Sequence, residues 1–262
     1  MFSQFRFLIR LPRKSVLFFS VIVAAGILAA PYTETVKANG MAKESEHVIL
    51  VHGMARSAST MNSMAETLRQ AGYTVTILDY PSRKKTIQKL TDEHLAPAVK
   101  ECRSQGATKI HFVTHSLGGI LVRDFLSRHQ APELGRVVML APPNQGSEVV
   151  DCIGHWRAFK MINGPVGEQL GTAKESPPRS LGKVDYPVGI IAGDRSINPL
   201  NSGMIPGPDD GKVSVENTKL EGMTDHTVLH CTHPMIMKRP DAIKLTLRFL
   251  QEGEFKETGS DD

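Results

Sequence analysis

The sequence predicts an α/β fold with a mostly parallel sheet and helices on both of its faces. From residue 47 onward, short β-rich runs alternate with amphipathic segments, and most of these runs are continuously apolar. Continuous apolar runs are typical of strands that are covered on both faces. Strands that alternate with helices form parallel sheets. With 262 residues, of which 40% are hydrophobic and 22% charged, the chain has the composition of an ordinary globular protein.

The strands and helices follow from the apolar spacing. The runs expected as strands are 47–51, 73–80, 109–115, 137–141, 188–192 and 227–231. Helical spacing predicts helices over 61–71, ended by Gly72, over 86–104, interrupted at Pro97, and over 117–129. A last helix is expected to begin at Pro240, a residue that suits the first turn.

Three other segments break the regular alternation. Residues 144–185 contain Gly and Pro and are long for a connection, so we expect a small cap over the carboxyl-terminal edge of the sheet. Residues 196–211 are rich in Pro, Gly and Asn without a period, which predicts a loop. Residues 253–262 form a polar tail that is expected to be flexible and frayed.

Residues 1–38 have the pattern of an export signal. Four cations, Arg6, Arg10, Arg13 and Lys14, precede an uncharged run over residues 16–30. That run has 15 residues, fewer than the ~20 of a spanning helix. We expect cleavage after Ala38 and a periplasmic or secreted domain over residues 39–262. The alternative is an uncleaved signal anchor, which would associate the protein with the membrane through its apolar segment.

The charge and the cysteine content argue against a nucleic-acid-binding protein, a zinc site and a disulfide-rich fold. Five of the 31 Lys and Arg and one of the 27 Asp and Glu precede Asn39, so residues 39–262 hold 26 of each. A neutral domain lacks the clustered cations that bind nucleic acid. The cysteines Cys102, Cys152 and Cys231 fit no zinc pattern and are too few for a disulfide framework. If any pair bridges, we expect Cys152 with Cys231; the alternative is three free thiols.

The strongest candidate for a catalytic residue lies at the end of the third predicted strand. The segment Thr114-His115-Ser116-Leu117-Gly118-Gly119 joins that strand directly to a helix. Such a tight turn projects its middle side chain and aims free helix N–H groups at the same point. The segment resembles the nucleophile elbow of the α/β-hydrolase superfamily, G-x-S-x-G, with Thr114 in place of the first glycine. The resemblance implies an α/β-hydrolase fold, with Ser116 as the nucleophile.

Two further segments extend this resemblance to the ends of neighbouring strands. His52-Gly53-Met54 is similar to the superfamily's oxyanion loop, which implies an oxyanion hole made by the backbone N–H groups of Met54 and Leu117. The stretch from Pro142 to Ser147 is similar to the Pro-Pro-Asn-x-Gly-Ser stretch of bacterial lipase-like hydrolases. The resemblance implies that His52 shapes the oxyanion loop and that His115 packs on a neighbour, so neither needs to titrate. Arg56 either meets an anionic group of a substrate or is solvated or ion-paired.

A serine nucleophile needs a histidine base and an acid that orients it. His233 follows the last strand and precedes the last helix, where the superfamily keeps its base. Asp210 lies in a stretch, Asp210-Gly211-Lys212-Val213-Ser214, that resembles the acid segment of bacterial lipases. Asp194, directly after the fifth predicted strand, is the alternative acid.

The resemblance implies a serine hydrolase, an esterase or lipase, that acts on carboxylic esters through an acyl-enzyme, and the pattern of residues 1–38 predicts that it is exported. We expect no cofactor and no metal, a small-molecule or lipid ester as the partner, and no nucleic acid. The alternatives are an acyltransferase, thioesterase or amidase with the same residues, or a binding protein that has lost turnover.

Overall fold

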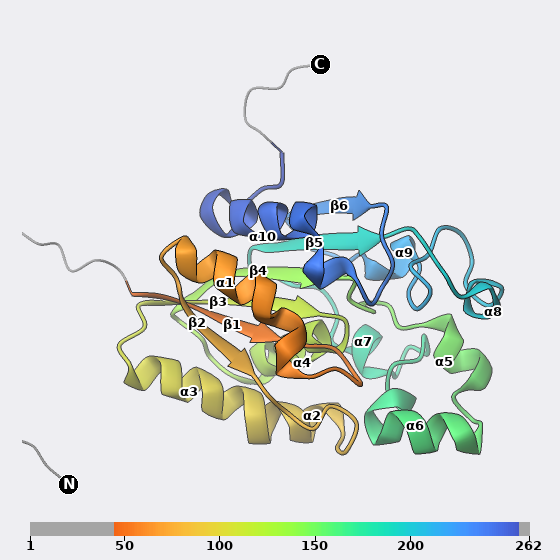
Figure 1. Ribbon diagram of the computed structural model, residues 1–262. Helices are drawn as coiled ribbons and strands as arrows, with labels where there is room; N and C mark the ends of the chain where they lie inside the picture. Colours follow the sequence, from red (N-terminus) through yellow and green to blue (C-terminus); the bar gives the residue numbers. More distant parts are fainter. Residues whose placement is uncertain (1–44, 257–262) are drawn as a thin grey trace, which may run out of the picture. The chain divides into compact units, whose positions relative to one another are not determined.

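Six parallel strands form the central sheet of the computed structural model, which describes residues 45–256 (Figure 1). Their order is β2-β1-β3-β4-β5-β6, and every neighbouring pair runs parallel. The strands are β1 (Glu46–Val51), β2 (Thr74–Leu78), β3 (Lys109–His115), β4 (Leu134–Leu140), β5 (Val188–Gly193) and β6 (Asp225–Leu229). The predicted α/β class with a parallel sheet is therefore confirmed.

Both faces of the sheet are buried, as the apolar runs predict. Along β1, Ile49 and Val51 belong to one apolar core while Val48 and Leu50 belong to the other, because successive strand side chains point to opposite faces. The first core lies under α3 (Ala96–Ser104) and α4 (Leu117–Arg128). The second lies under α1 (Asn62–Gln70) and α10 (Pro240–Glu252).

The predicted interruption at Pro97 takes a specific form. The helical segment continues from α2 (Ile87–Leu90) through a π-helical turn, Thr91–Leu95, into α3. Pro97 then lies in the first turn of α3, where its missing N–H costs nothing. The π-helical turn before Pro97 is wider than an α-helical turn, and the segment is helical both before and after it.

The segment expected as a cap contains α5 (Glu148–Ile153), α6 (Arg157–Glu168) and α7 (Pro177–Ser180). These helices lie at the end of the sheet toward which the strand arrows point (Figure 1). Gly164 has φ 65° and ψ −168°, so α6 is kinked just before Pro165. The remaining short helices are η1 (Ala58–Met61), α8 (Pro199–Ser202), α9 (Val215–Thr218) and η3 (Ile236–Lys238).

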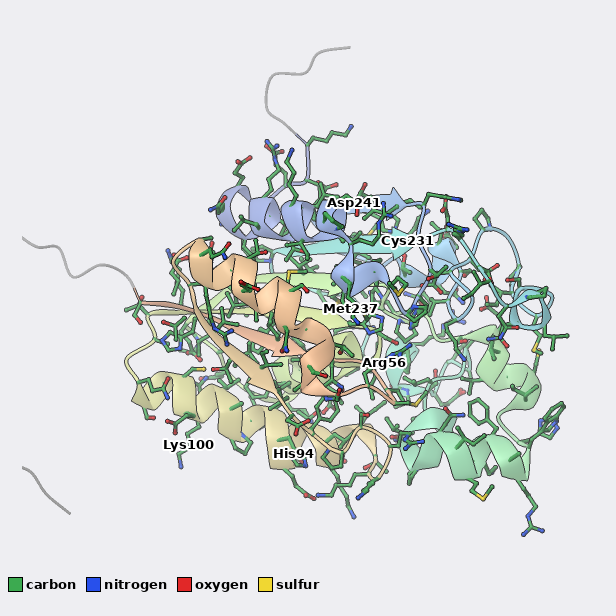
Figure 2. All side chains as sticks on the ribbon, in the orientation of Figure 1. Arg56, His94, Lys100, Cys231, Met237 and Asp241 are labelled. Atoms are coloured by element: carbon green, nitrogen blue, oxygen red, sulfur yellow. The ribbon has the colours of Figure 1, made fainter. Side chains whose placement is uncertain are left out.

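Several sequence-based expectations need correction. The expected tail is not frayed over residues 253–256: Phe255 is buried against Phe249, and its N–H donates to Asp225 at 2.7 Å. No bridge joins Cys152 and Cys231, and all three cysteines are free. Cys152 is exposed on α5, whereas Cys231 is buried beside the sheet (Figure 2).

The predicted signal, its cleavage site and residues 257–262 lie outside the described residues. Among residues 45–256, no helix is both long enough and apolar enough to span a bilayer.

Candidate active site

Ser116 lies at the turn between β3 and α4 in a conformation that L residues rarely adopt, with φ 53° and ψ −121°. Two glycines permit this turn. A Cβ on Gly118 would collide with the backbone carbonyl oxygen of Val51 in β1, and a Cβ on Gly53 would lie 2.7 Å from His115 Nδ1. Close packing of α4 and the Gly53 loop against the turn therefore holds Ser116 in its strained conformation.

Thr114, which replaces the glycine usual at this position, fits for a related reason. Its side chain is fully buried, and its hydroxyl lies 3.4 Å from the carbonyl oxygen of Val138 in the neighbouring strand. A Cβ on Gly119 would lie 3.4 Å from Thr114 Oγ1 and 3.2 Å from Pro142. The room left by Gly119 thus accommodates the larger side chain at residue 114.

His233 follows β6 and hydrogen-bonds to Ser116 on one side and to an acid on the other. Its Nε2 lies 3.0 Å from Ser116 Oγ, and its Nδ1 lies 2.7 Å from Asp210 Oδ2. The side chain of Asp210 is fully buried and that of His233 nearly so. A carboxylate accepts at Nδ1, so Nδ1 carries the proton and the Nε2 lone pair faces the serine hydroxyl.

The loop around Asp210 fixes the orientation of its carboxylate. Oδ1 accepts the backbone N–H groups of Lys212 at 3.0 Å and Val213 at 2.9 Å. The backbone carbonyl of Asp210 accepts the N–H of His233 at 3.0 Å. Asp194, the alternative acid, is instead 2.9 Å from the exposed His230. The structure brings Ser116, His233 and Asp210 together and leaves Asp194 outside this set.

The backbone N–H groups expected to form an oxyanion hole belong to Leu117, which directly follows Ser116, and to Met54, which lines the cavity that contains Ser116. Within residues 45–256 neither of them donates to another group of the protein. The loop that carries Met54 is braced by Tyr80, whose hydroxyl donates to the carbonyl of His52 at 2.6 Å and whose ring stacks on that of His52. Ala55, with φ 56°, donates its N–H to Ser82 Oγ at 3.1 Å. Backbone N–H groups without a partner in the protein are the type of donor that stabilises a developing oxyanion.

His115 contributes more than packing, which sequence reasoning missed. Its Nε2 donates to the backbone carbonyl of His233 at 3.0 Å, so the residue before Ser116 ties down the loop that carries the histidine. Burial, followed by the charge of the nearby His233, lowers the pKa of His115 well below its ordinary value. His115 is therefore neutral and acts as a fixed hydrogen-bond donor.

An apolar cavity of about 360 Å³ lies over Ser116 and His233. The cap and the oxyanion loop supply much of its lining, including Met54, Phe159 and Leu170. A volume of this size is at the lower end of small-molecule sites. It is shaped to hold an apolar group next to the serine hydroxyl.

The stretch from Pro142 to Ser147 connects the cap to the loop that holds Asp210. Ser147 Oγ donates to the carbonyl of Lys212 at 2.7 Å. Asn144 accepts from Arg123, a buried α4 residue that also donates to Pro178 at 2.8 Å and Gly182 at 2.8 Å. Burial lowers the pKa of Arg123 to about 10. The cap is thus anchored to α4 and to the loop that holds Asp210, beside the site.

Over the described part of the chain, no three His, Cys, Asp or Glu side chains are grouped so that they could hold a metal ion. The arrangement can do nucleophilic chemistry with a serine, a histidine base and two free N–H donors.

Comparisons with known proteins agree with this architecture. The palmitoyl protein thioesterase family model matches residues 47–175, just under half of the chain. The mature lipase BlEst2 of Bacillus licheniformis is 24% identical, with a TM-score of 0.62 over 79% of this chain and 92% of that one. Among curated protein sequences, none matches the chain.

Two other solved structures are similar. The phospholipase PlaB of Legionella pneumophila, in complex with thio-NAD, is 19% identical, with a TM-score of 0.64 over 80% of this chain and 59% of that one. The metagenomic carboxyl esterase MGS0156 is 15% identical, with a TM-score of 0.61 over 80% of this chain and 76% of that one. At these identities the likeness establishes the fold, which is shared with lipases and esterases.

Proposed function

Because the chain has the α/β-hydrolase fold, we propose that it is a serine hydrolase that cleaves carboxylic esters. Ser116 is the nucleophile, His233 the general base, and Asp210 the residue that orients the base. The observation that carries the proposal is the continuous hydrogen-bonded series from Ser116 Oγ through His233 to Asp210, with distances of 3.0 and 2.7 Å. A hydroxyl next to an oriented imidazole is the arrangement that activates serine near neutral pH.

The reaction begins when Ser116 Oγ attacks the ester carbonyl carbon and its proton passes to His233 Nε2. The carbonyl oxygen becomes an oxyanion, and the N–H groups of Met54 and Leu117 stabilise it. The imidazolium, stabilised by Asp210, then protonates the leaving alkoxide as the carbon–oxygen bond breaks. A water molecule, deprotonated by His233, attacks the acyl-enzyme and releases the carboxylic acid and free Ser116.

The apolar cavity over Ser116 supports an acyl chain as the part of the substrate that enters it. Phe159 and Ile162 of α6, Leu170 and Val213 line it together with Met54. Burial of each methylene contributes about 0.8 kcal/mol. Activity is therefore expected to rise with chain length until the cavity is full.

A thioester is the second candidate substrate, because the palmitoyl protein thioesterase family model matches residues 47–175. That range includes Met54 and Ser116, and so the oxyanion loop and the nucleophile turn. The same steps cleave a thioester, with a thiolate in place of the alkoxide. Acyl transfer to an alcohol uses the same acyl-enzyme and differs only in the acceptor.

Hydrolysis of 4-nitrophenyl esters graded from acetate to palmitate tests the proposal, with Ser116→Ala as the control. We expect activity that depends on Ser116 and reaches a maximum at one chain length. A short-chain maximum indicates a carboxylesterase, and a long-chain maximum that increases at an interface indicates a lipase. Equal rates for the wild type and Ser116→Ala at every length would refute it.

We also propose that the enzyme acts outside the cytoplasmic membrane. The support is the sequence pattern of residues 1–38, namely cations, a short apolar run and a small-residue cleavage site. Amino-terminal sequencing of the protein from its native host is expected to begin at Asn39. A mature protein that begins at Met1 and remains in the soluble cytoplasmic fraction would contradict export.

A further inference from the structure

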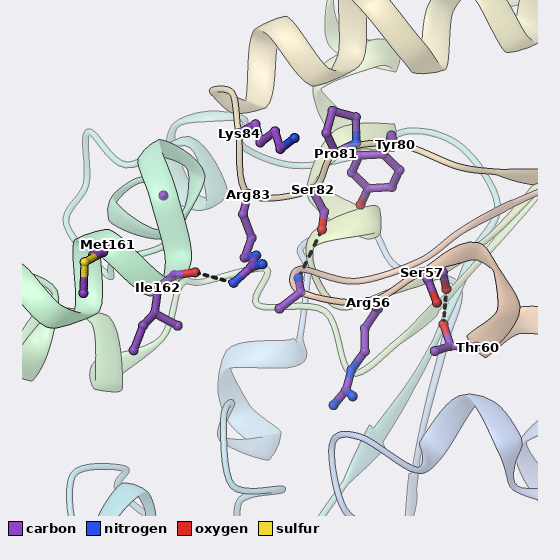
Figure 3. Close-up of a pocket in the computed structure, with 12 residues that line it drawn as sticks. Arg56, Ser57, Thr60, Tyr80, Pro81, Ser82, Arg83, Lys84, Met161 and Ile162 are labelled. Atoms are coloured by element: carbon purple, nitrogen blue, oxygen red, sulfur yellow. Dashed lines mark hydrogen bonds between the residues drawn. The ribbon is translucent and has the colours of Figure 1, made fainter.

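A second cavity, of about 630 Å³, adjoins the apolar cavity over Ser116. Ala55, Arg56 and Ile162 line both cavities, so the two adjoin beside the oxyanion loop. On its other side the second cavity is lined by residues 80–84, between β2 and α2, and by the kinked part of α6. Figure 3 shows the residues that line this second cavity.

The lining of this second cavity is cationic. Arg56, Arg83 and Lys84 all line it, and none of its twelve lining residues is acidic. Over residues 45–256 these three side chains form no ion pair, whereas the adjacent Lys85 is paired with Glu93. All three side chains are exposed, and as cations that line one concavity they give it a positive potential, which favours an anion as its ligand.

The cavity wall is held in position by contacts between segments far apart in the sequence. Arg83 donates from Nη1 to the carbonyl of Ile162 at 2.9 Å (Figure 3). A Cβ on Gly164 would collide with the backbone carbonyl of Arg83, so the positive φ of Gly164 lets α6 approach this loop closely. Ser82, which is buried, accepts the N–H of Ala55 and links the wall to the oxyanion loop.

Guanidinium groups present several donors in a plane that matches phosphate oxygens. Arg83 uses one of its five N–H donors on Ile162, and the others remain available. Lys84 adds a point charge, and Arg56 lies where the two cavities meet. The chemistry of the wall therefore favours a phosphate-bearing group over a neutral one.

We propose that this cationic cavity binds a phosphate on the leaving-group side of the acyl substrate while the acyl chain occupies the apolar cavity. The inference rests on the proposed function and narrows its substrate class to acyl esters or thioesters of a phosphate-bearing alcohol or thiol. Such a phosphate has two sources, a glycerophospholipid headgroup and a soluble coenzyme.

Two matched substrate pairs distinguish these sources. The lipid pair is octanoylglycerol 3-phosphate and octanoylglycerol, which differ only in the phosphate. The coenzyme pair is octanoyl-coenzyme A and the neutral octanoyl thioester of N-acetylcysteamine. We compare kcat/KM within each pair for the wild type, for the double variant Arg83→Gln with Lys84→Gln, and for Lys100→Gln. Lys100 is an exposed cation on α3, away from Arg56 (Figure 2).

The wild type and Lys100→Gln are expected to prefer the phosphate-bearing member of one pair by about tenfold or more, the effect of one or two charge-assisted hydrogen bonds. The double variant is expected to lose most of that preference. A wild type without preference in either pair, or a double variant that keeps it, overturns the phosphate site but not the proposed hydrolase.

Binding measured without turnover distinguishes failure of the phosphate site from failure of the proposed hydrolase function. In the Ser116→Ala background, calorimetry compares octanoylglycerol 3-phosphate with octanoylglycerol and octanoyl-coenzyme A with its neutral thioester, and then adds the Arg83 and Lys84 substitutions. Tighter binding of a phosphate-bearing member that the substitutions abolish supports the site even if no ester is hydrolysed. Equal binding within both pairs overturns it. Absence of Ser116-dependent hydrolysis of all four substrates counts against the proposed function alone.

Discussion

Substitution of Asp210 by Asn is expected to move the proton of His233 from Nδ1 to Nε2 and to leave the loop around residue 210 intact. The Oδ1 position accepts two backbone N–H groups, from Lys212 and Val213. The amide oxygen of Asn takes that position because an amide NH₂ cannot accept, so the NH₂ faces His233 Nδ1 across the present 2.7 Å. The NH₂ then donates to Nδ1, and the proton moves to Nε2, where the base must have a lone pair for Ser116.

We expect Asp210→Asn to lower kcat by about 10³ to 10⁴, which is about 4 to 5.5 kcal/mol of transition-state stabilisation. KM is expected to change little, since the acyl cavity is not altered. The assay is hydrolysis of a 4-nitrophenyl ester, with circular dichroism and thermal unfolding to show that the variant is folded.

Asp194→Asn is the matched control, because Asp194 pairs with the exposed His230 instead. Its kcat is expected to stay within about twofold of wild type, as exposed pairs contribute little. Asp210→Asn activity above a tenth of wild type, or an equally large loss in Asp194→Asn, would refute the orientation argument.

Three further predictions concern the fold. Arg123→Met leaves the carbonyls of Pro178 and Gly182 in the cap without their donor and is expected to lower the free energy of unfolding by about 3 kcal/mol. The control, Arg103→Met at an exposed arginine, is expected to lower it by less than about 1 kcal/mol, and urea titration measures both values. Burial lowers the pKa of His52 and His115 in the folded protein, so their contribution to the free energy of unfolding is complete above pH ~6.5. Below that pH the free energy of unfolding is expected to fall by up to about 1.4 kcal/mol per pH unit for each histidine. Urea midpoints that stay constant from pH 7.5 to 5.5 would contradict this. A thiol reagent is expected to titrate one group quickly in the native protein, the exposed Cys152, and three after unfolding, whereas one titratable thiol after unfolding would indicate a disulfide.

The parts of this protein that are local in sequence could be predicted. Strands buried on both faces produce apolar runs, and the turn at Ser116 is specified by its own neighbours, Leu117, Gly118 and Gly119. The α/β-hydrolase fold was therefore predictable and is confirmed. The segment around Asp210 carries a motif, so the sequence alone favours Asp210 over Asp194.

The features that depend on contacts between distant segments could not be predicted. Arg123 is a charged residue in an ordinary helical pattern, and only the return of the chain at Pro178 and Gly182 shows why it is buried. The same holds for Arg83, whose partner Ile162 lies in the cap. Phe255 is a single aromatic residue in a polar tail, and its burial requires the ring of Phe249.

Covalent labelling of Ser116 tests the central claim most directly. A fluorophosphonate reacts with a serine only when a neighbouring base activates it, so we expect mass spectrometry to find one adduct, on the peptide that contains Ser116. Labelling is expected to disappear in Ser116→Ala and to fall sharply when His233 is replaced by Ala. Absence of labelling in the folded wild type, or labelling that persists in Ser116→Ala, would contradict the account.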